Sequence, residues 1–304
     1  MKKTAYETIS SYLPERICTQ LNDIPVHIRD KLCEIRLRVG RPVSLVQCNC
    51  LYYVTMSGNL SENGRTDNLL IVTIEDVQEI LRRLCRYSVH SFERELRQGY
   101  FTIENGVRVG VSGVRNDSDS PLKYAGGFNF RIAREVIGCA ENIFGKLYST
   151  QISSVLVCGG PNSGKTTILR DLCRLCGNKY KVTVIDERSE ISASVDGLPF
   201  FDTGLQTDIL EGINRCDGII SAIRTLSPHI IFCDEISTCD DAEALINGYG
   251  CGVKFISTVH AESLADLYKR QGIELLLEKG VFDYAVFLQG ESFPGKVKEI
   301  RRLK

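Results

Sequence analysis

The fold is decided by one stretch, Val155-Leu-Val-Cys-Gly159-Gly-Pro-Asn-Ser-Gly164-Lys165-Thr166-Thr167. Its spacing matches G-x-x-x-x-G-K-[ST], the signature of a phosphate-binding P-loop. An apolar run precedes the glycines and apolar residues at helical spacing follow them, so the stretch predicts a strand, a tight turn and a helix N-terminus. Backbone N–H groups and the helix dipole both favour phosphate in that geometry.

The loop is therefore predicted to bind the phosphates of ATP. We expect Lys165 to reach the outer phosphates as a catalytic cation, and the Thr166 hydroxyl to ligate Mg²⁺. The predicted nucleotide contacts are Gly159, Gly160, Pro161, Asn162, Ser163, Gly164, Lys165, Thr166 and Thr167.

Apolar strands alternate with helical segments in the second half, which predicts a parallel sheet with helices on both faces. Strands expected at 181–185, 229–233 and 254–259 end in Asp186-Glu187, Asp234-Glu235 and His260. Ligands bind at the carboxyl ends of such strands. The fold class is predicted to be α/β, a RecA/AAA-like P-loop NTPase sheet preceded by a smaller α/β domain.

The strand ends supply the remaining predicted catalytic residues. Asp234 would hold Mg²⁺, directly or through water, and Glu235 would polarise the attacking water. Glu187 is a second candidate to polarise the attacking water. Alternatively, the acidic turn that carries Glu187 is a solvated turn on the surface. His260 could sense the γ-phosphate and relay hydrolysis, although a lone histidine is more often structural.

The first half predicts a separate domain over residues 1–145, with the ATPase domain over 146–304. A capped helix is expected to begin at Thr73, a hairpin over 99–113, and an exposed loop over 116–127. An arginine from a neighbouring subunit often neutralises transition-state charge in phosphoryl transfer. The candidate arginines are Arg131 and Arg134, with Arg108 and Arg115. For each of them the alternative is a solvated charge on the surface.

Composition limits the other possibilities. The chain has 304 residues, 25% of them charged, and a net charge of −1, which gives no bulk attraction to nucleic acid or anionic membranes. No apolar run reaches the roughly 18 residues of a spanning helix, and the N-terminus has no signal-peptide core. We therefore expect a cytoplasmic protein with no integral membrane segment. Its 13 cysteines are expected to be reduced thiols.

These motifs together resemble the secretion and pilus-motor ATPases of the type II/type IV superfamily, which carry a comparable acidic box and histidine box. The resemblance covers about residues 10–300 and is closest to a branch that acts in sporulation. The stretches that carry it are Glu34-Ile-Arg-Leu-Arg-Val-Gly-Arg-Pro, Asn129-Phe-Arg-Ile-Ala-Arg-Glu, Cys158-Gly-Gly-Pro-Asn-Ser-Gly-Lys-Thr-Thr, Val184-Ile-Asp-Glu-Arg-Ser-Glu-Ile and Cys233-Asp-Glu-Ile.

The resemblance implies a hexameric ATPase that uses ATP and Mg²⁺ in the mother cell of an endospore-forming bacterium. It would associate peripherally with the forespore membrane by docking on membrane-embedded sporulation channel proteins. Its N-terminal domain would pack against the next subunit and supply arginines. One departure is that secretion ATPases usually have Gly-Glu where this chain has Asp234-Glu235, which makes Glu235 the matched glutamate and leaves the role of Asp234 open.

Two alternatives remain at this point. The first is a P-loop ATPase that acts on single-stranded nucleic acid, against which the net charge argues. The second is a scaffold that binds ATP in order to assemble and does not hydrolyse it.

Overall fold

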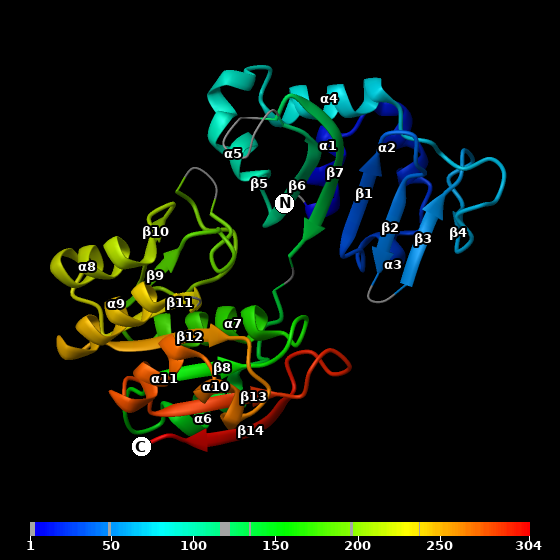
Figure 1. Cartoon of the computed structure of the whole chain (residues 1–304). Coiled ribbons are helices and arrows are strands. Elements are labelled where there is room, and N and C mark those ends of the chain that lie inside the picture. Colours follow the sequence, from blue (N-terminus) through cyan, green and yellow to red (C-terminus); the bar gives the residue numbers. More distant parts are fainter. Residues whose placement is uncertain (1–3, 48–49, 116–121, 134, 195–196, 237) are drawn as a thin grey trace. The chain divides into compact units, whose positions relative to one another are not determined.

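The computed structural model describes residues 4–47, 50–115, 122–133, 135–194, 197–236 and 238–304. The chain divides into two compact units, Met1–Ala133 and Arg134–Lys304 (Figure 1). The segment 135–145, which the sequence assigned to the first domain, lies in the second unit. There the backbone N–H of Ala140 donates to the buried carboxylate of Asp171 (2.7 Å).

The first unit is built on a seven-stranded antiparallel sheet of order β4-β3-β2-β1-β7-β6-β5. The strands are β1 Glu34–Arg38, β2 Ser44–Gln47, β3 Cys50–Val54, β4 Leu60–Ser61, β5 Tyr100–Ile103, β6 Val107–Val114 and β7 Tyr124–Ile132. The helices are α1 Ala5–Tyr12, α2 Glu15–Asn22, α3 Val26–Arg29, α4 Ile74–Leu84, the 3-10 helix Val89–Phe92 and α5 Glu93–Gln98.

One face of this sheet is apolar and the other is polar. Ile35 and Leu37 of β1 are buried in a core that includes residues of α1, α2 and α4, whereas Arg36, which lies between them, and Arg38, which follows them, are exposed. This is the alternation that a half-buried strand requires.

Local sequence signals account for several of these elements. Thr73 caps α4 in a reciprocal capping box with Asp76, as predicted. The predicted hairpin is also confirmed, with β5 and β6 joined through positive φ angles at Asn105 and Gly106. The expected exposed loop over 116–127 is wrong at its end, because β7 already begins at Tyr124.

The second unit has a sheet of order β10-β9-β11-β12-β8-β13-β14, parallel except for the pairing of β13 with β14. The strands are β8 Val155–Cys158, β9 Val182–Asp186, β10 Thr207–Glu211, β11 Ile230–Glu235, β12 Lys254–Val259, β13 Tyr284–Leu288 and β14 Val297–Arg302. The helices are α6 Glu141–Leu147, α7 Lys165–Gly177, α8 Arg215–Thr225, α9 Cys239–Gly250, α10 Leu264–Tyr268 and α11 Gln271–Glu278.

Helices cover both faces of this second sheet. Residues of α6 and α7 share one apolar cluster with alternate strand residues such as Val155 and Val157. Residues of α8, α9, α10 and α11 share another with Leu156 and Cys158. The predicted parallel sheet covered on both faces is therefore confirmed, and its carboxyl strand ends meet at one edge. Within the described ranges, no helix has the length and apolar character needed to cross a membrane.

Candidate active site

The glycine loop, residues 159–164, joins β8 to α7. Its φ angle is positive at Asn162 (56°) and Gly164 (89°), just before Lys165 begins the 13-residue helix α7. A Cβ on Gly164 would lie 2.5 Å from the backbone nitrogen of Gly295, so only glycine fits. The predicted strand, turn and helix are confirmed, and they form the helix N-terminus at which an anion is stabilised.

The ammonium group of Lys165 is buried against this loop. Its Nζ donates to the carbonyl oxygens of Gly159 (3.0 Å) and Gly160 (2.7 Å), and it lies 3.1 Å from Nδ1 of His260. Burial lowers the pKa of Lys165, while the carboxylates at the end of β11 act in the opposite direction. A phosphate would offer this ammonium a charged acceptor, which makes a stronger hydrogen bond than a carbonyl does.

His260 lies between Lys165 and Glu235. An ammonium can only donate, so Nδ1 of the neutral imidazole accepts and the ring proton is on Nε2. That Nε2 is 3.5 Å from Oε1 of Glu235. Because β11 and β12 pair in parallel, with Glu235 opposite Thr258, the two strand ends are adjacent. Three residues predicted separately from sequence therefore form one continuous chain.

Asp234 faces other carboxylates. Its Oδ1 accepts a hydrogen bond from Thr258 Oγ1 (3.2 Å). Burial raises the pKa of Asp234 to about 7, and the carboxylates of Glu190 and Asp186 add to the effect. A cation relieves such an excess of negative charge, and carboxylate and hydroxyl oxygens suit Mg²⁺. Asp234, together with Thr166 in the first turn of α7, could therefore hold the predicted metal.

The protein alone does not complete a metal site. Among the residues that the structure describes, no three His, Cys, Asp or Glu side chains are grouped so that they could hold an ion. Mg²⁺ commonly takes one or two protein ligands and completes its shell with substrate phosphates and water. The residues present fit that pattern.

Neutralising Asp234 is expected to stabilise the nucleotide-free protein at high pH. Its folded-state pKa lies above the ordinary 3.8, so the stability it contributes is complete below about pH 4 and is lost as the pH rises through about 7. Asp234→Asn should raise the free energy of unfolding by about 1–3 kcal/mol near pH 8.5, and by less than half of that near pH 5. Urea unfolding without Mg²⁺ measures this, and equal stability of the two proteins near pH 8.5 would contradict it.

Two carboxylates, at the end of β9 and at the start of the acidic turn that follows it, stabilise the conformation of that turn. Asp186 is buried and accepts hydrogen bonds from the backbone N–H groups of residues 190–192 (2.8–3.0 Å). Glu187 accepts one from the backbone N–H of Arg215 (2.6 Å) and lies 3.3 Å from its guanidinium. Arg215 is buried at the start of α8, so Glu187 ties the acidic turn to that helix.

Glu190 is the carboxylate that the sequence analysis left out of the site. Its carboxylate lies close enough to Asp234 to help raise the pKa of that residue, whereas the carboxylate of Glu187 contacts Arg215. In the sequence, the one signal for Glu190 was its place in the acidic turn that follows the strand expected at 181–185. Contacts alone could separate the two glutamates.

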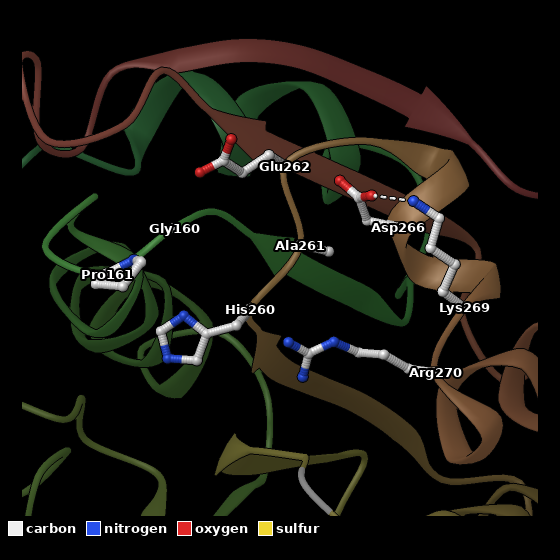
Figure 2. Close-up of a pocket in the computed structure, with 8 residues that line it drawn as sticks. All are labelled: Gly160, Pro161, His260, Ala261, Glu262, Asp266, Lys269 and Arg270. Carbon is white, nitrogen blue, oxygen red and sulfur yellow. Dashed lines mark hydrogen bonds and ion pairs between the residues drawn. The ribbon is translucent and has the colours of Figure 1, made fainter.

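A cavity of about 370 Å³ opens beside the glycine loop. In Figure 2 the guanidinium of Arg270 points toward His260, while Asp266 and Lys269 pair with each other (3.2 Å). Arg270 adds a second cation near Lys165, and sequence reasoning missed it because no motif marks it. The lining residues are Gly160, Pro161, His260, Ala261, Glu262, Asp266, Lys269 and Arg270.

Three of the four candidate arginines, Arg108, Arg115 and Arg131, belong to the first unit. Arg108 and Arg131 are opposite each other in β6 and β7, and Arg131 lies 3.8 Å from Glu34. Arg115 instead donates to the carbonyl oxygens of Leu96 and Arg97 at the end of α5, which favours a structural role. The predicted Arg134 lies outside the described residues.

One family matches nearly the whole chain. A family model described as "Sporulation stage III, protein AA" matches residues 3–304. The stage III sporulation protein AA of Bacillus subtilis (strain 168) is 35% identical over 301 residues, which cover 96% of this chain and 94% of that protein.

Solved structures of a pilus motor and of an ATPase have the same fold. The pilus retraction motor PilT, solved with bound ADP, aligns with a TM-score of 0.59 and 13% identity, over 94% of this chain and 78% of PilT. The Legionella pneumophila ATPase DotB aligns with a TM-score of 0.56 and 13% identity, over 90% of this chain and 77% of DotB. The predicted fold class, an α/β P-loop NTPase sheet preceded by an α/β domain, is confirmed.

Proposed function

This chain belongs to the sporulation stage III, protein AA family, and from that membership we propose that it is an ATP-hydrolysing motor. Its task would be to power or gate the channel between mother cell and forespore during endospore formation. One observation carries the proposal of hydrolysis. Lys165, His260 and Glu235 form a continuous chain from the glycine loop to the end of β11.

Binding begins with an exchange of hydrogen bonds. The backbone N–H groups of residues 159–167, apart from Pro161, and the N-terminus of α7 would hold the phosphates of ATP. Lys165 would leave the carbonyl oxygens of Gly159 and Gly160 for the outer phosphates. Bound Mg²⁺, held by Asp234 and Thr166, would neutralise charge on the phosphates.

Glu235 is the proposed water-orienting residue. It lies at the end of β11, next to Asp234, and its carboxylate meets the imidazole Nε2 of His260. When Lys165 turns to phosphate, His260 loses a partner at Nδ1 and can respond to the γ-phosphate. His260 would thereby couple the state of the nucleotide to the β12–α10 segment.

The contacts of the acidic turn suggest a division between its glutamates. Glu187 is engaged by Arg215, which also pairs with Asp241 (2.8 Å), so we assign it a supporting role for the turn. Glu190 has its carboxylate at Asp234 and is the better placed second candidate to orient water.

The active form is proposed to be a homo-oligomeric ring, in which the first unit supplies arginines to a neighbouring subunit. The polar face of its sheet supports this proposal. Arg131, Arg108, Arg36 and Arg38 lie on it, and Glu34 is the acidic residue that pairs with two of them. Partners would be membrane-embedded sporulation proteins, contacted from the cytoplasm of the mother cell.

Mixed rings test hydrolysis and arginine donation together. Phosphate release from ATP is measured for the parent, for Lys165→Ala, for Arg131→Ala, and for a mixture of the two variants. If Arg131 acts on a neighbour's site, each variant is inactive alone and the mixture regains about a quarter or more of the parent activity. No release by the parent would contradict the ATPase, while a parent that is active and an inactive mixture would contradict donation by Arg131.

A further inference from the structure

Arg170 lies on α7, five residues after Lys165, and contacts the acidic turn. Its Nε donates to the backbone carbonyl oxygen of Glu190 (2.7 Å). Its guanidinium carbon lies 4.7 Å from the centre of the Phe201 ring. Neither the motifs nor the proposed chemistry uses this side chain, although it reaches from the glycine-loop helix α7 to the acidic turn.

The backbone of Glu190 is held on both sides. Its N–H donates to Asp186 Oδ1 (2.8 Å), and its carbonyl accepts from Arg170 (2.7 Å). Because both backbone polar groups of Glu190 are hydrogen-bonded, the direction of its Cα–Cβ bond is restricted. The positions that its carboxylate can take beside Asp234 are therefore restricted as well. Asp186 is the last residue of β9, which leads directly into this turn, whereas Arg170 comes from the glycine-loop helix α7.

The charges near Arg170 are consistent with this arrangement. Burial lowers its pKa, whereas the carboxylates of Glu190, Asp186 and Asp234 act in the opposite direction. A buried guanidinium keeps its proton at physiological pH. It therefore supplies a permanent positive charge beside carboxylates whose mutual repulsion would otherwise push the acidic turn away from β11.

We propose that Arg170 is a positioning residue for hydrolysis, which fixes the Glu190 backbone to α7 so that the Glu190 carboxylate stays beside Asp234. The inference rests on the proposed ATPase activity. Through this contact, the helix that begins at the phosphates and the turn that faces the attacking water would move as one body.

An arginine is better suited to this place than a lysine. Its planar group can donate from Nε to a carbonyl while its face stacks on an aromatic ring, which a tetrahedral ammonium cannot do. Phe201 is buried, so it offers a fixed surface for that stacking. Replacing Arg170 would take away the donor that α7 supplies to the carbonyl of Glu190.

The test separates catalysis from binding. Arg170→Met should lower kcat for ATP about 10–100-fold, because a displacement of about 1 Å at a reacting group has an effect of that order, while ATP affinity changes less than about 3-fold. Arg170→Lys should recover only part of kcat. Arg174→Met is the matched control, since Arg174 is one turn later on α7 and pairs with Asp171 (2.7 Å), outside the carboxylate group.

A double-mutant cycle distinguishes positioning from general support of the fold. If Arg170 acts through Glu190, then Arg170→Met adds little to the kcat loss of Glu190→Gln, and the two effects are far from additive. Additive losses, or a kcat equal to that of the parent in Arg170→Met, would overturn the proposal. If Arg170→Met does not fold, the comparison of Arg170→Lys with Arg174→Lys decides, and equal kcat values would overturn it.

These outcomes are distinct from a failure of the proposed function. A parent protein that releases no phosphate from ATP contradicts the ATPase itself. A parent that turns over ATP, with Arg170→Met and Arg174→Met equally active, contradicts the role of Arg170 alone.

Discussion

Glu235→Gln is expected to lower kcat for ATP hydrolysis about 10³-fold and to leave ATP affinity within about 3-fold of the parent. The amide keeps the shape of the side chain but cannot accept a proton from water. It also weakens the contact with the His260 Nε2–H, which lies 3.5 Å from Oε1 in the parent. Phosphate release and equilibrium ATP binding, measured on the same samples, give the two quantities.

A matched control is Glu278→Gln, because Glu278 is exposed at the end of α11 and away from the strand ends. It should retain the parent kcat. Glu190→Gln should also lower kcat, whereas Glu187→Gln should mainly lower thermal stability by weakening the contact with Arg215. A larger kcat loss in Glu187→Gln than in Glu235→Gln would contradict this assignment of the carboxylates.

Lys165→Ala should weaken ATP binding about 100-fold or more, since it removes a charge-assisted hydrogen bond to phosphate in a buried setting. Its effect on the nucleotide-free fold should be small, because the ammonium is buried against two carbonyls and its burial is unfavourable for the charge. Calorimetric titration with ATP and a thermal melt without it measure the two effects.

The exposed Lys146 on α6 provides the control for Lys165. Lys146→Ala should bind ATP as the parent does. If Lys165→Ala bound ATP as tightly as Lys146→Ala, then the glycine loop would not be the phosphate site.

Much of the second unit could be predicted because its signals are local. The glycine spacing, the apolar strands and the polar residues at their ends each lie within a few consecutive residues. Parallel pairing then brings those ends together without further information. This is why Lys165, Glu235 and His260 could be chosen from sequence and lie adjacent in the structure.

The residues that were missed depend on contacts between distant segments. Glu190 and Glu187 cannot be ranked without Arg215, which lies more than twenty residues away along the chain. Arg270 lines the same cavity as Gly160 and Pro161 of the glycine loop, although more than a hundred residues separate them along the chain. No periodicity or motif carries that information.

The strand β10 and the start of β7 were also missed, for different reasons. β10, Thr207–Glu211, is an edge strand with little apolar alternation. The start of β7 contains glycines that look like loop residues. A Cβ on Gly127 would lie 2.5 Å from the carbonyl oxygen of Leu37, so the glycine allows close strand approach instead of marking a turn.

The most direct test of the proposed motor is ATP turnover by the purified parent protein with Mg²⁺, with the particle mass measured on the same samples with and without ATP. We expect sustained phosphate release by an oligomeric ring, and we expect Glu235→Gln to bind ATP and to accumulate that ring without turnover. A parent that binds ATP and assembles but never releases phosphate, even with membranes that carry its partner, would contradict the motor and make ATP an assembly ligand.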